Sequence, residues 1–128
     1  MFYRINGSHN YSYQDQGVRQ TNAYVYHFET FVTGDFRKMT TGLILVDIQN
    51  DYFAGGRMEL VGMHAAAENA SRLLAHFRDN QQPTFHIQHI SNREGATFFL
   101  PDTRGVEIHA GIKPAEDDLV IQKHFPNS

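Results

Sequence analysis

The chain has 128 residues, 41% hydrophobic and 20% charged, which is typical of a single globular domain. A formal net charge of −3 is opposite to the basic character that binds nucleic acid or anionic membranes, so neither partner is expected. Cysteine is absent, which excludes a disulfide framework, a thiolate zinc site and a cysteine nucleophile within this chain. Neither a membrane-spanning apolar run nor a signal-peptide core is visible, so we expect a soluble, cytoplasmic protein.

The composition changes near residue 38. Residues 1–38 contain no leucine but hold five of the six tyrosines. Their first part lacks helical or strand periodicity, although residues 23–32 have strand propensity. We interpret residues 1–38 as an irregular extension, for example from a misassigned start codon, and residues 39–128 as the domain. The alternatives are a genuine β-hairpin arm, or strands that cap an open sheet.

From residue 39 onward the pattern alternates between strand and helix. An apolar run at 43–46 is typical of a strand buried on both faces, as in parallel sheets. Apolar residues then recur at three- and four-residue steps from Met63 to Phe77, which predicts an amphipathic helix. Two further short strands are predicted at 84–88 and 119–122, the second after a long polar loop. Strand, helix and strand in this order predict a βαβ unit with a right-handed crossover.

Two charged residues end the predicted strands. Asp47 follows the first strand and Lys123 follows the third. Parallel strands end at the same edge of a sheet, where ligands bind in open α/β folds. We therefore expect a carboxylate and an ammonium on one edge. A plain salt bridge or two solvated strand ends would explain the same pattern.

Two other polar motifs suggest metal sites, and we assign neither of them to metal. His86 and His89 are three residues apart on a predicted strand, so their side chains point to opposite faces unless the strand ends between them. The acidic run Glu116–Asp118 precedes a strand, where a solvated loop is the commoner structure. No metal and no cofactor are expected.

Two further motifs lie in predicted loops. Gly55-Gly56 matches no phosphate-binding pattern and indicates a turn with unusual backbone angles. Residues 98–101, Phe-Phe-Leu-Pro, form an apolar stretch within a polar loop. This stretch is either a plug on the core or a wall of a substrate pocket.

Two segments resemble a known family. Residues 43–53, Leu-Ile-Leu-Val-Asp-Ile-Gln-Asn-Asp-Tyr-Phe, followed by Gly55-Gly56, resemble the first motif of the isochorismatase-like cysteine hydrolases. Residues 120–125, Val-Ile-Gln-Lys-His-Phe, resemble the strand that carries the essential lysine of that superfamily. The resemblance covers about residues 40–128.

The resemblance implies an α/β fold, a three-layer sandwich around a mostly parallel sheet with the Rossmann-type strand order 3-2-1-4-5-6. This chain would hold only the first half. The implied catalytic residues are Asp47 and Lys123, together with a cysteine that lies beyond Ser128 in a full domain. Around them we expect a pocket for a small-molecule substrate, with candidate lining residues Gln49, Phe53, His89 and Phe98.

The implied mechanism is hydrolysis of an amide-type bond by an activated thiol. Asp47 would accept the thiol proton, and Lys123 with a helix N-terminus would favour the thiolate. The Asp-x-His metal motif of nicotinamidase-type members has no counterpart at Ile87–Ser91, so the metal is not carried over. Isochorismatase itself works without the cysteine, on a vinyl ether.

A half-domain has physical consequences. The first strand would be left with a free apolar edge, which is a pairing or aggregation site. We therefore expect a marginal chain that forms a homo-oligomer or requires the completing C-terminal half. Two functions fit: the front portion of an amidohydrolase, inactive alone, or a non-catalytic remnant that serves as an interaction or dimerisation module.

Overall fold

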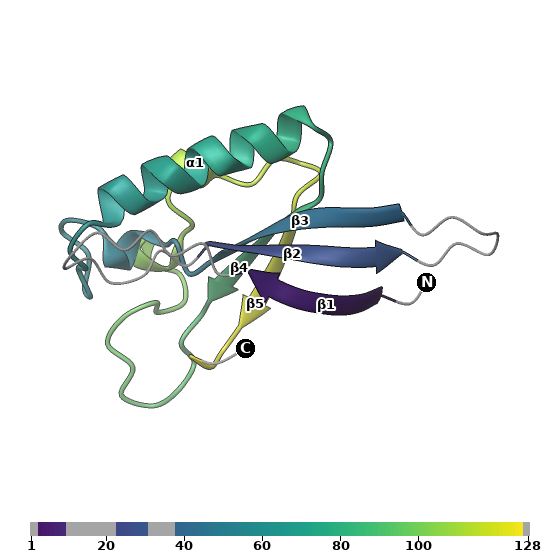
Figure 1. Cartoon of the computed structure of the whole chain (residues 1–128). Helices are drawn as coiled ribbons and strands as arrows, with labels where there is room; N and C mark the ends of the chain where they lie inside the picture. Colours follow the sequence, from purple (N-terminus) through teal and green to yellow (C-terminus); the bar gives the residue numbers. More distant parts are fainter. Residues whose placement is uncertain (1–2, 10–22, 31–37, 127–128) are drawn as a thin grey trace.

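The computed structural model describes residues 3–9, 23–30 and 38–126, with side chains from Thr41 onward. Five strands form one sheet: β1 (Tyr3–His9), β2 (Ala23–Thr30), β3 (Lys38–Val46), β4 (Thr84–His89) and β5 (Leu119–Lys123). The helix α1 (Met63–Asp79) lies across one face of the sheet (Figure 1). Short 3-10 turns occur at Asn50–Tyr52, Arg104–Val106 and Ala110–Ile112.

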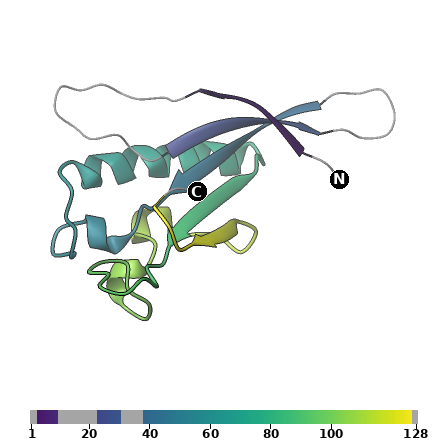
Figure 2. The same ribbon diagram turned by 90° about the horizontal axis from the view of Figure 1, so that it is seen from below.

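The strands occur in the order β1-β2-β3-β4-β5. Strands β3, β4 and β5 are parallel, as the βαβ pattern predicted, whereas β1 and β2 are antiparallel additions. The loops after β3 and β4 gather at one end of the sheet (Figures 1 and 2). This end carries the candidate site, as expected for the carboxyl ends of parallel strands.

The N-terminal segment differs from our expectation. We interpreted residues 1–38 as irregular, but residues 3–9 and 23–30 are strands, and β2 pairs along the outer edge of β3. The predicted free edge of the first domain strand is therefore already occupied. The physical reason is that β3 exposes a row of unpaired backbone groups, and residues 23–30 have the β-propensity to satisfy them.

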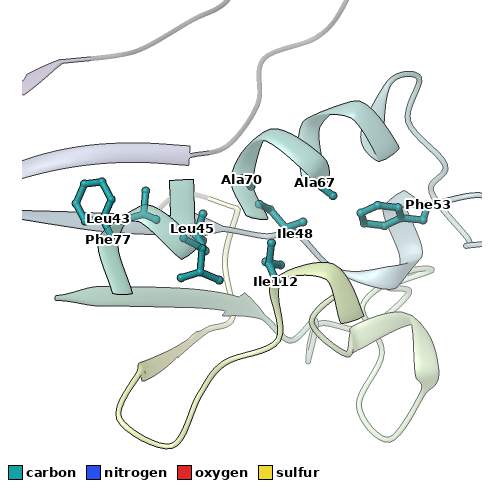
Figure 3. Close-up of a cluster of buried hydrophobic side chains, with 9 residues drawn as sticks. Leu43, Leu45, Ile48, Phe53, Ala67, Ala70, Phe77 and Ile112 are labelled. Carbon is teal, nitrogen blue, oxygen red and sulfur yellow. The ribbon is translucent and has the colours of Figure 1, made fainter. Parts of the chain in front are cut away.

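The core lies between α1 and the sheet (Figure 3). Ala67 and Ala70 are small, so the helix approaches closely to Leu43 and Leu45, which point from β3 toward it and are at most 1% exposed. Most of the predicted helix face is buried, as expected, but Leu73 is 38% exposed and lies at its margin.

The opposite face of the sheet is less well covered than predicted. We expected strands buried on both faces, but Ile44 and Val46 are only half-buried. In β5, Leu119 and Ile121 are 52% and 43% exposed. Helix α1 covers one face only, and a parallel sheet normally needs cover on both.

The acidic run before β5 is a solvated loop only in part, because its last residue, Asp118, has partners in the fold. The side chain of Asp118 is 7% exposed and forms an ion pair with Arg78 of α1, and its carboxylate also accepts a hydrogen bond from the Thr84 hydroxyl. His86 Nε2 lies 3.3 Å from the same carboxylate. Glu116 and Asp117 are exposed as expected. Asp118 therefore links α1 to β4 and β5. This role could not be predicted without knowing where α1 lies.

The ion pair predicts an acid-sensitive fold. Hydrogen bonds from Arg78 and Thr84 hold the pKa of Asp118 at about 2, below its ordinary 3.8, against the opposing effect of burial. A lowered folded-state pKa stabilises the fold above pH 4, and this stabilisation is lost as the pH falls toward 2. Asp118→Asn should cost about 2 kcal/mol at pH 7 and flatten the pH dependence of stability in that window, measured by urea denaturation. Asp117→Asn is the matched control; equal effects would contradict the assignment.

Candidate active site

The ends of three parallel strands build the site. Asp47 follows β3, His89 ends β4 and Lys123 ends β5, with His89 and Lys123 paired in register. Lys123 Nζ reaches across β4 and lies 3.0 Å from Asp47 Oδ2. The prediction that these two charges meet at one edge is confirmed, as an ion pair with both side chains about nine-tenths buried.

Asp47 is held in a special backbone conformation. Its φ is +55°, in the left-handed region that non-glycine residues seldom adopt. Its backbone N–H still donates to the Ile87 carbonyl at 3.0 Å, which continues the β3–β4 ladder. The conformation turns the chain sharply at the strand end. Strained residues of this kind concentrate at functional sites.

One oxygen of the Asp47 carboxylate is unused. Oδ2 binds Lys123, whereas Oδ1 is buried and has no hydrogen-bond partner among the described residues. A buried acceptor without a donor costs about 1–3 kcal/mol. Burial raises the pKa of Asp47 above its ordinary value and outweighs the opposing effect of Lys123. The group is therefore a buried acceptor with raised proton affinity.

Replacement of Lys123 tests this electrostatic balance. In Lys123→Met the pKa of Asp47 should rise further, because burial then acts without the opposing ammonium. The measurement is a carboxyl-carbon NMR titration. Lys113→Met, at an exposed position, should leave that pKa unchanged. An Asp47 pKa that is the same in all three proteins would mean that the ion pair does not form in solution.

His89 and Tyr52 lie within electrostatic reach of this pair. Burial lowers the pKa of His89, and Asp47 partly opposes this effect. Burial raises the pKa of Tyr52, and the Asp47 carboxylate raises it further. His89 was a predicted pocket residue, whereas Tyr52 was missed. Its position five residues after Asp47, in the first motif, was the signal available in the sequence.

Phe99 packs as a plug on the core, which was one of our two interpretations of this segment. Phe99 is completely buried, with its ring centroid 4.7 Å from that of Tyr52 and 5.5 Å from that of His89. Phe98 is half-buried, and its ring centroid lies 4.9 Å from that of Phe99. Phe98 lies next to Tyr52, with ring centroids 6.1 Å apart, and its role as a pocket wall stays a prediction.

Two predicted pocket residues have structural roles instead. The Gln49 amide is fully buried: its Nε2 donates to the carbonyls of His89 and Val106, and its Oε1 accepts the His89 N–H. No donor remains for a substrate, so Gln49 positions His89. Phe53 is part of the core cluster and stacks on His109, with ring centroids 3.8 Å apart. Glutamine and phenylalanine are both common in ligand pockets. Only the contacts in the structure show that these two side chains have structural roles.

A buried carboxylate next to the site was also missed. Asp51 is 2% exposed, and its side chain accepts the backbone N–H groups of Phe99, at 2.6 Å, and Arg57, at 3.1 Å. Phe99 has a φ of +55°. Asp51 therefore holds the aromatic segment in a strained conformation against His89 and Tyr52.

Comparisons with known proteins identify the domain that carries these residues. The isochorismatase domain model matches residues 41–128. This chain belongs to the isochorismatase family. The match begins inside β3 and includes Asp47, His89 and Lys123, whereas β1 and β2 lie outside it.

The similar proteins are about twice as long. An uncharacterised isochorismatase family protein of Bacillus subtilis, YddQ, is 53% identical over 90 residues, which is 70% of this chain and 50% of the relative. An isochorismatase-type hydrolase structure from Oleispira antarctica is 42% identical with a TM-score of 0.60, over 63% of this chain and 44% of that one. The N-carbamoylsarcosine amidase of Thermoplasma acidophilum shares the fold, at 20% identity and a TM-score of 0.57, over 63% and 50%.

The isochorismatase domain is therefore present here in part. The chain spans about half the length of the relatives it matches, and its three parallel strands correspond to that half. It contains no cysteine. Among the described residues, no helix is both long and apolar enough to cross a membrane.

Proposed function

We propose that this chain supplies the proton acceptor and the cationic partner of a hydrolase that cleaves small amide-type substrates. The nucleophile would come from a polypeptide segment that carries the other half of the domain. The observation that carries the proposal is the free, buried Oδ1 of Asp47 beside the Lys123 ion pair. A carboxylate with a raised pKa and one unused oxygen is suited to accept a proton.

The proposed reaction proceeds in two steps. Asp47 Oδ1 accepts the proton of a cysteine thiol, and the Lys123 ammonium favours the negative charge. The thiolate attacks the amide carbonyl carbon, the C–N bond breaks, and the amine leaves with a proton from Asp47. Water then hydrolyses the thioester, which releases the acid and restores the thiol.

The substrate would be small and partly apolar. Tyr52 and His89 lie within electrostatic range of Asp47, Phe98 lies beside Tyr52, and burial keeps the pKa of His89 low. A neutral imidazole beside aromatic rings suits an uncharged amide or ureido group. These residues would therefore set specificity, with the half-buried Tyr52 and Phe98 more accessible than the buried His89.

The test is reconstitution with a defined second half. The probe is the part of the B. subtilis relative that this chain does not match, about half of that protein. We expect release of ammonia or amine from a panel of amides and ureido compounds only when both polypeptides are present. If the intact relative hydrolyses the panel and a purified complex of the two halves does not, the proposal is wrong.

One observation favours the second function, an interaction module. Leu119 and Ile121 present apolar surface on the sheet face away from α1. Such a surface would hold a completing half, or a second copy of the chain, without any chemistry. A stable complex without turnover in the reconstitution experiment would favour this function.

A further inference from the structure

The β1–β2 hairpin occupies the outer edge of β3. Strand β2 pairs with β3 from Ala23↔Leu45 to Thr30↔Lys38, along nearly the whole strand. On its other side β3 pairs with β4, so both of its edges are occupied. The hairpin lies outside residues 41–128, the part that matches the isochorismatase domain.

The same edge is where the rest of a doubly wound domain would attach. Strands β4 and β5 both lie on one side of β3 (Figure 1). In open α/β sheets the strand order reverses at the first strand, and later strands are added on its other side. The chain spans about half of its relatives, so their remaining half is expected to pair with the outer edge of β3.

We propose that the hairpin is a displaceable cover, and that it competes with the second half of the domain for the outer edge of β3. This inference rests on the proposed function, since it concerns assembly of the same site. A backbone edge pairs with one strand at a time, because each N–H and C=O along it forms one ladder bond. Asp47 directly follows β3, so removal of the hairpin would open the edge next to the proton acceptor.

Competition makes a quantitative prediction about binding. The apparent affinity for the second half is reduced in proportion to the fraction of chains in which β3 is uncovered. The hairpin would also protect the edge from pairing with other copies of the chain. Locking the hairpin in place should therefore weaken binding of the second half, and releasing it should restore binding.

A reversible crosslink tests this directly. His27 and Thr41 are directly opposite in the β2–β3 register, and the chain has no native cysteine. The full-length double variant His27→Cys/Thr41→Cys can thus be locked by oxidation and released by reduction. The binding probe is the unmatched half of the B. subtilis relative with its cysteines replaced by serine. We expect the reduced form to bind this probe at least tenfold more tightly than the oxidised form.

The outcomes separate this inference from the proposed function. The His27→Cys single variant should bind equally under both conditions. If both forms of the double variant bind equally, the hairpin does not compete, whereas the proposed completion of the domain stands. If neither form binds, both proposals are overturned. Failure of the two cysteines to crosslink would overturn the pairing itself.

Hydrogen exchange on the unmodified chain gives a second measurement that does not depend on a variant. Addition of the probe should speed exchange of the β2 amides, residues 23–30, while the β3 amides at 43–46 stay protected. This pattern is expected only if one strand replaces another on β3. Unchanged exchange in β2 with the probe bound would overturn the inference.

Discussion

Replacement of Asp47 by asparagine is expected to lower turnover of the completed domain by about a thousandfold. The amide of asparagine cannot take a proton at the position of Oδ1, and it removes the charge that Lys123 neutralises. The measurement is the initial rate of amide hydrolysis by the chain with the second half of the B. subtilis relative, at matched concentrations of complex. A rate above one tenth of the original would remove Asp47 from its proposed role.

The control and the pH profile distinguish chemistry from loss of structure. Asp79→Asn makes the same chemical change at an exposed position of α1 and should leave the rate unchanged. Because burial raises the pKa of Asp47, activity should fall on the acid side at a pH above the ordinary value of 3.8 for an aspartate. Below that pH, Asp47 is protonated and cannot act as a base. In Lys123→Met this acid limb should move to still higher pH.

Gly105→Ala is expected to lower the free energy of unfolding by about 3 kcal/mol. A Cβ atom at this position would overlap the Asp51 carboxylate, which is itself 2% exposed and holds the N–H groups of Phe99 and Arg57. The carboxylate cannot move without leaving those donors unpaired. The measurement is the urea midpoint, together with the aromatic NMR shifts of Phe98 and Phe99 as a report on the site.

A matched glycine shows whether the effect is local. At Gly111 the nearest heavy atom to an added Cβ is in the His109 ring, at 3.2 Å, which a small movement of that side chain relieves. Gly111→Ala should therefore cost less than about 1 kcal/mol and leave the site signals in place. Equal destabilisation by the two substitutions would mean that Asp51 does not hold the aromatic segment.

Short-range patterns predicted the centre of the fold correctly. The apolar run before Asp47, the helical spacing from Met63 to Phe77 and the short strands predicted at 84–88 and 119–122 gave three parallel strands and α1 where the structure has them. These features depend on local periodicity, which is visible in one chain segment at a time. The site ion pair followed, because parallel strands end at a common edge.

Features that depend on distant contacts were not predictable in this way. Asp118 looked like part of a solvated acidic run until Arg78 of α1 was placed beside it. Gln49 was predicted to line a pocket and Asp51 was not singled out, and the roles of both depend on hydrogen bonds with backbone groups 40 to 57 positions away. Hydrogen bonds of this kind leave no periodic signal in the sequence.

By itself, the sequence determined the parallel half-sheet, the helix that covers it and the two charges at its carboxyl edge. Each of these features depends on the spacing of residue types within one short segment of the chain. Only the tertiary structure decided which buried polar groups act as structural anchors, which single oxygen of Asp47 stays free, and that β2 takes the outer edge of β3. The reason is physical: a polar side chain or a strand edge acquires its role from the partner that satisfies it, and those partners come from distant parts of the chain.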